Sequence, residues 1–233
     1  MPRLALTVLS SLLLISGAGL LVDSGLSLDR EQLGAGTAPS AGAAGQTVSP
    51  AGGPLPAGTP DTSGVPVELV IPFASSNHPD GVVAPISADP LTADGDLFVP
   101  DDPRAVSWAM EDAAPGAPRG TAILVGHVNY VVDGELVRGA LSDLAEYAVE
   151  HVGGTFTVVL ADGRRLDYRI TGAEQYDKDQ LAARPELRQA LYDQESAFGA
   201  GTGRLVLVSC GGKFDRRTGN YEDNIFVFAL PVD

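Results

Sequence analysis

Short apolar runs separated by turn residues characterise the chain from residue 67 onward. Runs that alternate in polarity or are fully apolar predict strands, and clusters of Gly, Pro, Asn and Asp predict turns. The predicted strands are residues 67–72, 81–86, 122–125, 155–160, 164–176, 204–209 and 224–232. Pro85 makes the second run a candidate edge strand, and Ala161-Asp162-Gly163 predicts a hairpin between the fourth and fifth runs.

Two short helices are predicted among these strands. Residues 141–152 repeat apolar side chains at helical spacing, and Gly153-Gly154 end the pattern. Residues 185–195 predict a second, shorter helix. Roughly eight strands with only short helices favour an all-β fold, a closed eight-stranded barrel of antiparallel type, over an alternating βαβ sheet.

The N-terminal segment is apolar enough to enter a membrane. Leu4 to Val22 carries no charge, Arg3 precedes it and Asp23 follows. A helix needs about 20 such residues to cross a bilayer, and a cleaved signal peptide shares the pattern. Because the apolar run continues past the small residues 16–19, we favour an uncleaved single-pass anchor, with the bulk of the chain outside the cell membrane. Export follows from either interpretation.

Residues 34–66 are predicted to be a linker. They are rich in Gly, Pro and Ala, carry one charge at Asp61, and hold almost no large apolar side chain. Such a segment buries too little surface to offset its ordering entropy. It suits a spacer that holds a domain away from a membrane, although composition alone does not separate a spacer from a filler. The predicted organisation is therefore an anchor or signal (1–33), a linker (34–66) and a folded domain (67–233).

Charge and cysteine usage exclude several classes of protein. The 233 residues carry 15 Lys plus Arg against 30 Asp plus Glu, a formal net charge of −15. A phosphate backbone repels such a chain, so nucleic-acid binding is disfavoured. With a single cysteine, the chain forms no disulfide within itself and no multi-thiolate metal site.

That cysteine, Cys210, is the first candidate for chemistry. It follows the apolar strand RLVLVS and precedes Gly211-Gly212, which predicts a thiol at a strand end beside a sharp turn. An exported protein meets an oxidising environment in which a free thiol is easily oxidised, so a retained cysteine suggests a specific role. Three interpretations stay open at this point: a catalytic nucleophile, a buried small apolar residue, or half of an intermolecular disulfide.

A thiol nucleophile needs an imidazole nearby. His127 ends the apolar run AILVG much as Cys210 ends its own, so neighbouring strands with matched ends bring the two together. His78 lies in a polar turn and is expected to be solvated. His151 ends the predicted helix, where a cation favours the helix dipole, and is expected to be a structural cap.

These residues resemble the sortases, membrane-anchored cysteine transpeptidases of Gram-positive bacteria. Sortases carry Gly-His at the end of one barrel strand and Leu/Val-x-Thr-Cys at the end of a later one. Here the two motifs read LVGH, residues 124–127, and VLVSC, residues 206–210. The stretches CGGKFDRRTGNYEDNIFVFA, residues 210–229, and LFVPDDPRAVSW, residues 97–108, are most similar to the actinobacterial class F subgroup.

The chain departs from the sortase pattern in two places. Ser209 replaces the usual Thr and keeps a hydroxyl. Sortases also place an Arg near the start of the strand after the cysteine, and here Tyr221-Glu222-Asp223-Asn224 contains none. Arg216 and Arg217 in the preceding loop are the nearest guanidinium groups in sequence. The resemblance therefore assigns the substrate-binding and oxyanion role to Arg216, with a solvated loop charge as the alternative.

The resemblance implies an acyl transfer that needs no cofactor. Cys210 attacks the Thr–Gly amide of a secreted protein carrying a Leu-Pro-x-Thr-Gly-like (LPxTG-like) sorting signal, and His127 protonates the leaving amine. An amine of a cell-wall precursor or another protein then takes the acyl group. Some sortases use calcium, but the scattered Asp and Glu residues of this chain match no calcium site, so no metal ligand is predicted.

Two other functions remain open on the sequence. One is another exported cysteine acyl transferase acting on peptidoglycan, such as an L,D-transpeptidase. The absence of His or Arg within three residues of Cys210 argues against that motif. The other is a degenerate, non-catalytic barrel that binds peptides or acts as a scaffold, which the missing arginine keeps open.

Overall fold

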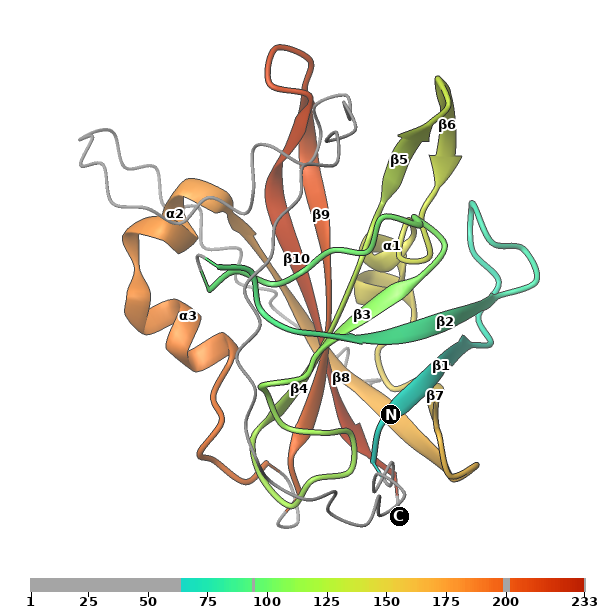
Figure 1. Ribbon diagram of the computed structural model, residues 1–233, viewed down its shortest axis with the longest axis vertical. Coiled ribbons are helices and arrows are strands. Elements are labelled where there is room, and N and C mark those ends of the chain that lie inside the picture. The colour runs from blue at the N-terminus through green and yellow to red at the C-terminus, as the bar shows by residue number, and fades with distance from the viewer. Residues whose placement is uncertain (1–63, 94, 199–201, 233) are drawn as a thin grey trace, which may run out of the picture.

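The computed structural model describes residues 64–93, 95–198 and 202–232 (Figure 1). The predicted membrane segment, residues 1–33, and all but the end of the predicted linker, residues 34–66, lie outside this part of the chain. Within the described residues, no helix combines the length and the apolar character that a membrane crossing requires.

Eight strands close into the predicted barrel. In spatial order they are β1 (Pro66–Ile71), β2 (Val82–Asp89), β3 (Val106–Ala109), β4 (Thr121–Gly126), β9 (Arg204–Asp215), β10 (Asn220–Pro231), β8 (Arg165–Asp177) and β7 (Thr155–Leu160). The barrel closes because β7 pairs with β1. The remaining described elements are the hairpin β5 (Asn129–Val132) and β6 (Glu135–Arg138), and the helices α1 (Leu144–Glu150), α2 (Lys178–Ala183) and α3 (Pro185–Leu191).

The barrel is mixed rather than antiparallel throughout. Strands β2 and β3 pair in parallel, and so do β4 and β9, whereas the other barrel neighbours are antiparallel. Each parallel pair is joined by a long connection: residues 90–105 lie between β2 and β3, and residues 127–203 lie between β4 and β9. Parallel strands need such crossovers, and local turn signals do not reveal them.

Several predicted elements change length or were missed. Strand β3, the hairpin β5–β6 and helix α2 were not predicted; the fully buried β3 has four residues, VSWA. The predicted helix 141–152 begins only at Leu144, and the predicted helix 185–195 ends at Leu191.

The prediction that β9 ends at Cys210 is wrong, because β9 continues to Asp215. The glycines after Cys210 form a bulge instead of a turn. Three steps from Gly211 to Phe214 oppose two steps from Asp223 to Tyr221, and Gly212 adopts φ 73°. As a result, β9 and β10 extend as a long hairpin beyond the barrel (Figure 1).

Two apolar clusters lie on opposite faces of β4, β9 and β10. Leu207 and Ile225 point into the barrel core together with Leu124. Val125, Val208 and Phe226 point outward and pack against Leu181 of α2 and Leu191 of α3. Strands β4 and β9 are therefore covered on both faces, which explains why their sequences are apolar runs without alternation.

A polar cluster fixes the loop after β1 to the start of α1. Asp143 is 4% exposed and accepts hydrogen bonds from Ser75 Oγ at 2.8 Å, from the Asn77 backbone N–H at 2.9 Å and from Asn77 Nδ2. Burial alone would raise the pKa of Asp143, but the hydrogen bonds from Ser75 and Asn77 and the nearby His78 hold it below its usual value.

The same loop supports the backbone of the candidate histidine. His78 Nε2 lies 3.1 Å from the Gly139 carbonyl oxygen and 3.0 Å from Ser142 Oγ. The Leu141 N–H in turn donates to the His127 carbonyl at 3.1 Å. The expectation that His78 is solvated is therefore wrong, because its ring joins this loop to the segment that carries His127.

Removing the Asp143 carboxylate should destabilise the fold. We expect Asp143→Ala to lower the free energy of unfolding at pH 7 by about 1–3 kcal/mol, because three buried or half-buried donors lose their acceptor. The folded-state pKa is depressed, so this stability is present above the unfolded pKa and is lost as the pH falls below about 4. Urea denaturation of the parent and of Asp143→Ala, at pH 7 and again well below pH 4, measures the difference in the free energy of unfolding. Asp80→Ala, at an exposed residue of the same loop, is the matched control.

Candidate active site

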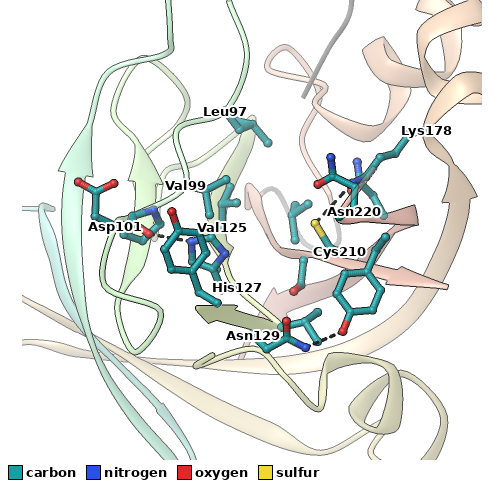
Figure 2. Close-up of a pocket in the computed structure, with 18 of the residues that line it drawn as sticks. Leu97, Val99, Asp101, Val125, His127, Asn129, Lys178, Cys210 and Asn220 are labelled. Atoms are coloured by element: carbon teal, nitrogen blue, oxygen red, sulfur yellow. Dashed lines mark hydrogen bonds between the residues drawn. The ribbon is translucent and has the colours of Figure 1, made fainter. Parts of the chain in front are cut away.

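The parallel pairing of β4 and β9 brings His127 and Cys210 to the same level. The last paired residues are Val125 and Val208, and His127 and Cys210 each lie two residues beyond them. Because side chains two residues apart share a face of a sheet, both point to the outer side, where Val125 and Val208 lie. Both line one pocket, and Figure 2 shows them facing it from opposite walls.

The pocket lies where the apolar outer cluster ends and the two hairpins begin. Leu97, Val99, Val125 and Val208 form its apolar base. The hairpin β5–β6 contributes Asn129 and Tyr130, and the hairpin β9–β10 contributes Phe214 and Tyr221. Asn129 Nδ2 donates to Tyr221 Oη at 2.6 Å, so the two hairpins are joined across the pocket. The lining thus combines an apolar base with a few polar groups, a composition typical of ligand pockets.

Cys210 is half-buried and has an ammonium group beside it. Lys178 Nζ, from the first residue of α2, donates to Cys210 Sγ at 3.6 Å. The ammonium therefore lies close enough to the sulfur to attract negative charge that develops on it. The cysteine is therefore not a fully buried apolar residue, and it lines a partly exposed pocket beside a charged group.

His127 is held by the segment between β2 and β3. Its Nε2 lies 2.8 Å from the Pro100 carbonyl oxygen, which only accepts, so Nε2 carries a proton. Burial lowers the pKa of His127, while the Pro100 hydrogen bond and the charge of Asp101 oppose that shift. In the neutral ring, Nδ1 therefore holds the lone pair that can accept a proton. Tyr130 packs beside the ring, 4.9 Å between centroids.

His151 does not belong to this pocket, and neither does His78. The His151 ring stacks on Phe73 at 4.3 Å between centroids, with the planes 5° apart. The backbone N–H of His151 donates to the Tyr147 carbonyl at the end of α1, so the residue does cap the helix. The side chain contributes by stacking, a contact that the helix-dipole argument does not include.

The structure does not bring Arg216 to the pocket. Arg216 and Arg217 lie in the turn between β9 and β10, both are exposed, and Arg217 pairs with Asp215 at 3.6 Å. Because β9 continues through the glycines, the hairpin carries these residues away from the sulfur. Among the described lining residues the basic side chains are His127 and Lys178, with no arginine.

Lys178 is a functional candidate that the sequence did not indicate. It lies 32 positions before Cys210, at the junction of β8 and α2, and no motif surrounds it. Its place beside the thiol depends on how β8 pairs with β10 and β10 with β9, which only the folded chain shows. In the described ranges, no three His, Cys, Asp or Glu side chains are grouped to hold a metal ion.

Loss of the Lys178 charge should slow reactions of the thiol. We expect Lys178→Met to lower the rate of Cys210 alkylation by iodoacetamide at pH 7 about fivefold, because the thiolate loses its cation. Lys213→Met is the matched control, since Lys213 is exposed on β9 and faces Glu222 at 3.9 Å. Equal alkylation rates for Lys178→Met and the parent would contradict the role of the ammonium. Mass spectrometry follows the modified protein.

The surroundings of His127 predict the direction in which its pKa is shifted. We expect NMR titration to give His127 a pKa below its ordinary value of about 6.5, because burial disfavours the imidazolium. Asp101→Asn should lower this pKa further, since the Asp101 charge raises it. Asp102→Asn, at the neighbouring exposed carboxylate, is the control and should leave the titration unchanged. An unaltered His127 titration in Asp101→Asn would contradict the electrostatic assignment.

Among the comparisons with known proteins, only the comparison with solved structures gives matches. No protein-family model matches the chain, and no curated protein matches it. Solved structures similar to the chain include sortase C1 from Streptococcus agalactiae, at 16% identity over 75% of this chain and 71% of that one, with a TM-score of 0.46. Sortase C-1 from Actinomyces oris matches at 17% identity, 72% and 73% coverage and a TM-score of 0.47. Sortase E1 from Streptomyces coelicolor matches at 18% identity, 74% and 91% coverage and a TM-score of 0.46.

Proposed function

We propose that this protein is a sortase-type cysteine transpeptidase, most similar to the class F subgroup, with Cys210 as nucleophile and His127 as general acid and base. The observation that carries the proposal is the parallel register of β4 and β9. It directs an imidazole and a free thiol into one pocket from adjacent strands. The ammonium of Lys178 places a positive charge beside the sulfur.

The residues divide the proton transfers between them. The Cys210 thiol gives its proton to His127 Nδ1, while Nε2 stays bonded to the Pro100 carbonyl. The thiolate attacks the scissile carbonyl carbon, forming a C–S bond and an oxyanion. As the carbonyl re-forms, the C–N bond breaks and the leaving amine takes the proton from His127. An incoming amine then displaces the sulfur by the reverse sequence, and the thiol is regenerated.

The pocket supports an extended peptide as the acyl donor. Its base is apolar, which suits Leu and Pro side chains, and its rim carries the Asn129 and Tyr221 hydrogen bond. We therefore propose a secreted protein with an LPxTG-like sorting signal as donor. The proposed acceptor is an amine of a cell-wall precursor or of another protein, with water as the default acceptor when no amine is bound.

The proposed location follows from the N-terminal sequence alone. An uncleaved helix within residues 4–22 would anchor the chain in the cell membrane, and residues 34–66 would extend the catalytic barrel toward the wall. A transpeptidase that joins exported proteins to the wall needs its site on that outer side.

Removing the nucleophile tests the proposed activity. We expect Cys210→Ala to abolish cleavage of a fluorogenic Leu-Pro-x-Thr-Gly peptide by the full-length protein, and His127→Ala to lower kcat by about 10²–10⁴-fold. The Arg216→Ala variant should cleave the peptide at the parental rate, since the Arg216 side chain lies outside the pocket.

Added triglycine should yield a ligated product that mass spectrometry detects. Cleavage by Cys210→Ala at the parental rate would overturn the mechanism, and a parent that binds but never cleaves would favour the scaffold function.

A further inference from the structure

Asn224 lies directly opposite Cys210 on the neighbouring strand. The Cα register of β9 and β10 pairs Asn224 with Cys210 and Phe226 with Val208. Residues directly opposite one another in an antiparallel pair share a face, with Cβ atoms roughly 4.5–5.5 Å apart. Asn224 therefore projects on the same side of the sheet as the nucleophile, and both residues line the pocket.

The amide nitrogen of Asn224 is buried without a hydrogen-bond partner among the described residues. The residue is 2% exposed. Buried side-chain donors almost always have a partner, so a donor left without one needs an explanation. Asn224 lines both the candidate active site and an adjoining pocket that also contains Lys178. Asn224 therefore shares a pocket lining with Cys210, His127 and Lys178.

Lys178 contacts the sulfur of Cys210, so a different group must stabilise the oxyanion. Lys178 Nζ contacts Sγ itself, so its charge acts on the attacking atom. The oxyanion forms later, on the carbonyl oxygen bonded to the carbon that the sulfur attacks. A second donor is needed there. The segment from Tyr221 to Asn224 contains no arginine, and its amide at Asn224 is a donor that lines the pocket.

We infer that Asn224 is a catalytic residue that stabilises the oxyanion, an inference that rests on the proposed acyl transfer. When the Cys210 thiolate attacks the carbonyl carbon, the π electrons move to oxygen, and Asn224 Nδ2–H donates to that oxygen. Collapse of the intermediate re-forms the carbonyl and expels the amine that His127 protonates. The amide stays neutral throughout, and its unmet hydrogen bond is made only when charge develops on the substrate.

Two reactions of the Cys210 sulfur distinguish oxyanion stabilisation by Asn224 from a general effect on the reactivity of the thiol. Acylation of Cys210 by p-nitrophenyl acetate passes through an oxyanion and requires no sorting signal, whereas alkylation by iodoacetamide forms no oxyanion. We expect Asn224→Ala and Asn224→Leu, which is close to Asn in size and adds no charge beside the sulfur, to slow acylation by about 10²-fold and to leave alkylation within about twofold of the parent. Gln189→Ala, which removes an exposed amide on α3, is the matched control and should alter neither rate.

The peptide assay adds the link to the proposed function. With the fluorogenic Leu-Pro-x-Thr-Gly peptide, Asn224→Ala should lower kcat by about 10²–10³-fold with little change in KM, since the interaction exists only in the transition state. Acylation at the parental rate in both variants would overturn the inference, as would a loss of alkylation equal to the loss of acylation. If the parent cleaves no peptide but the acylation rates differ as expected, the proposed function fails and the role of Asn224 stands.

Discussion

The parallel pairing between β4 and β9 is the constraint on which the candidate site depends. It joins two strands separated by residues 127–203 and ends at Val125 and Val208. Up to that point both strands are covered by apolar side chains on both faces, so burial fixes their register. A slip of one residue would turn Cys210 or His127 into the barrel core. Hydrophobic packing thus sets the geometry of a polar site that contributes little packing itself.

The end of this pairing also creates the space for chemistry. Beyond Val208, β9 keeps its partner β10 and loses β4, while the chain after His127 turns into the hairpin β5–β6. Figure 1 shows both hairpins extending beyond the same end of the barrel. The pocket lies between them and above the outer apolar cluster. Its floor is apolar, and a low local dielectric strengthens each charge and hydrogen bond at the rim.

Local patterns in the sequence account for most of the barrel and for two residues of the site. Apolar runs located seven strands, Ala161-Asp162-Gly163 located a hairpin, and the matched ends of two runs singled out His127 and Cys210. What the sequence did not show depends on register between distant segments. The parallel pairs, the Lys178 contact and the position of Asn224 opposite Cys210 all require knowing which strand lies beside which. Arg216 was assigned from the family resemblance and from its nearness in sequence to Cys210. The structure separates the two residues because Gly211-Gly212 form a bulge within β9, which continues to Asp215.

Two separate side chains have different physical consequences from a single arginine. A guanidinium would combine fixed charge with several donors in one rigid fork, whereas here the charge belongs to Lys178 and the candidate oxyanion donor is the neutral Asn224. The ammonium contacts the attacking sulfur, and a neutral amide adds no charge that would disfavour the imidazolium. This separation matters because burial already lowers the pKa of His127. A second fixed cation beside the ring would lower that pKa further and leave less of the acid that the leaving amine needs.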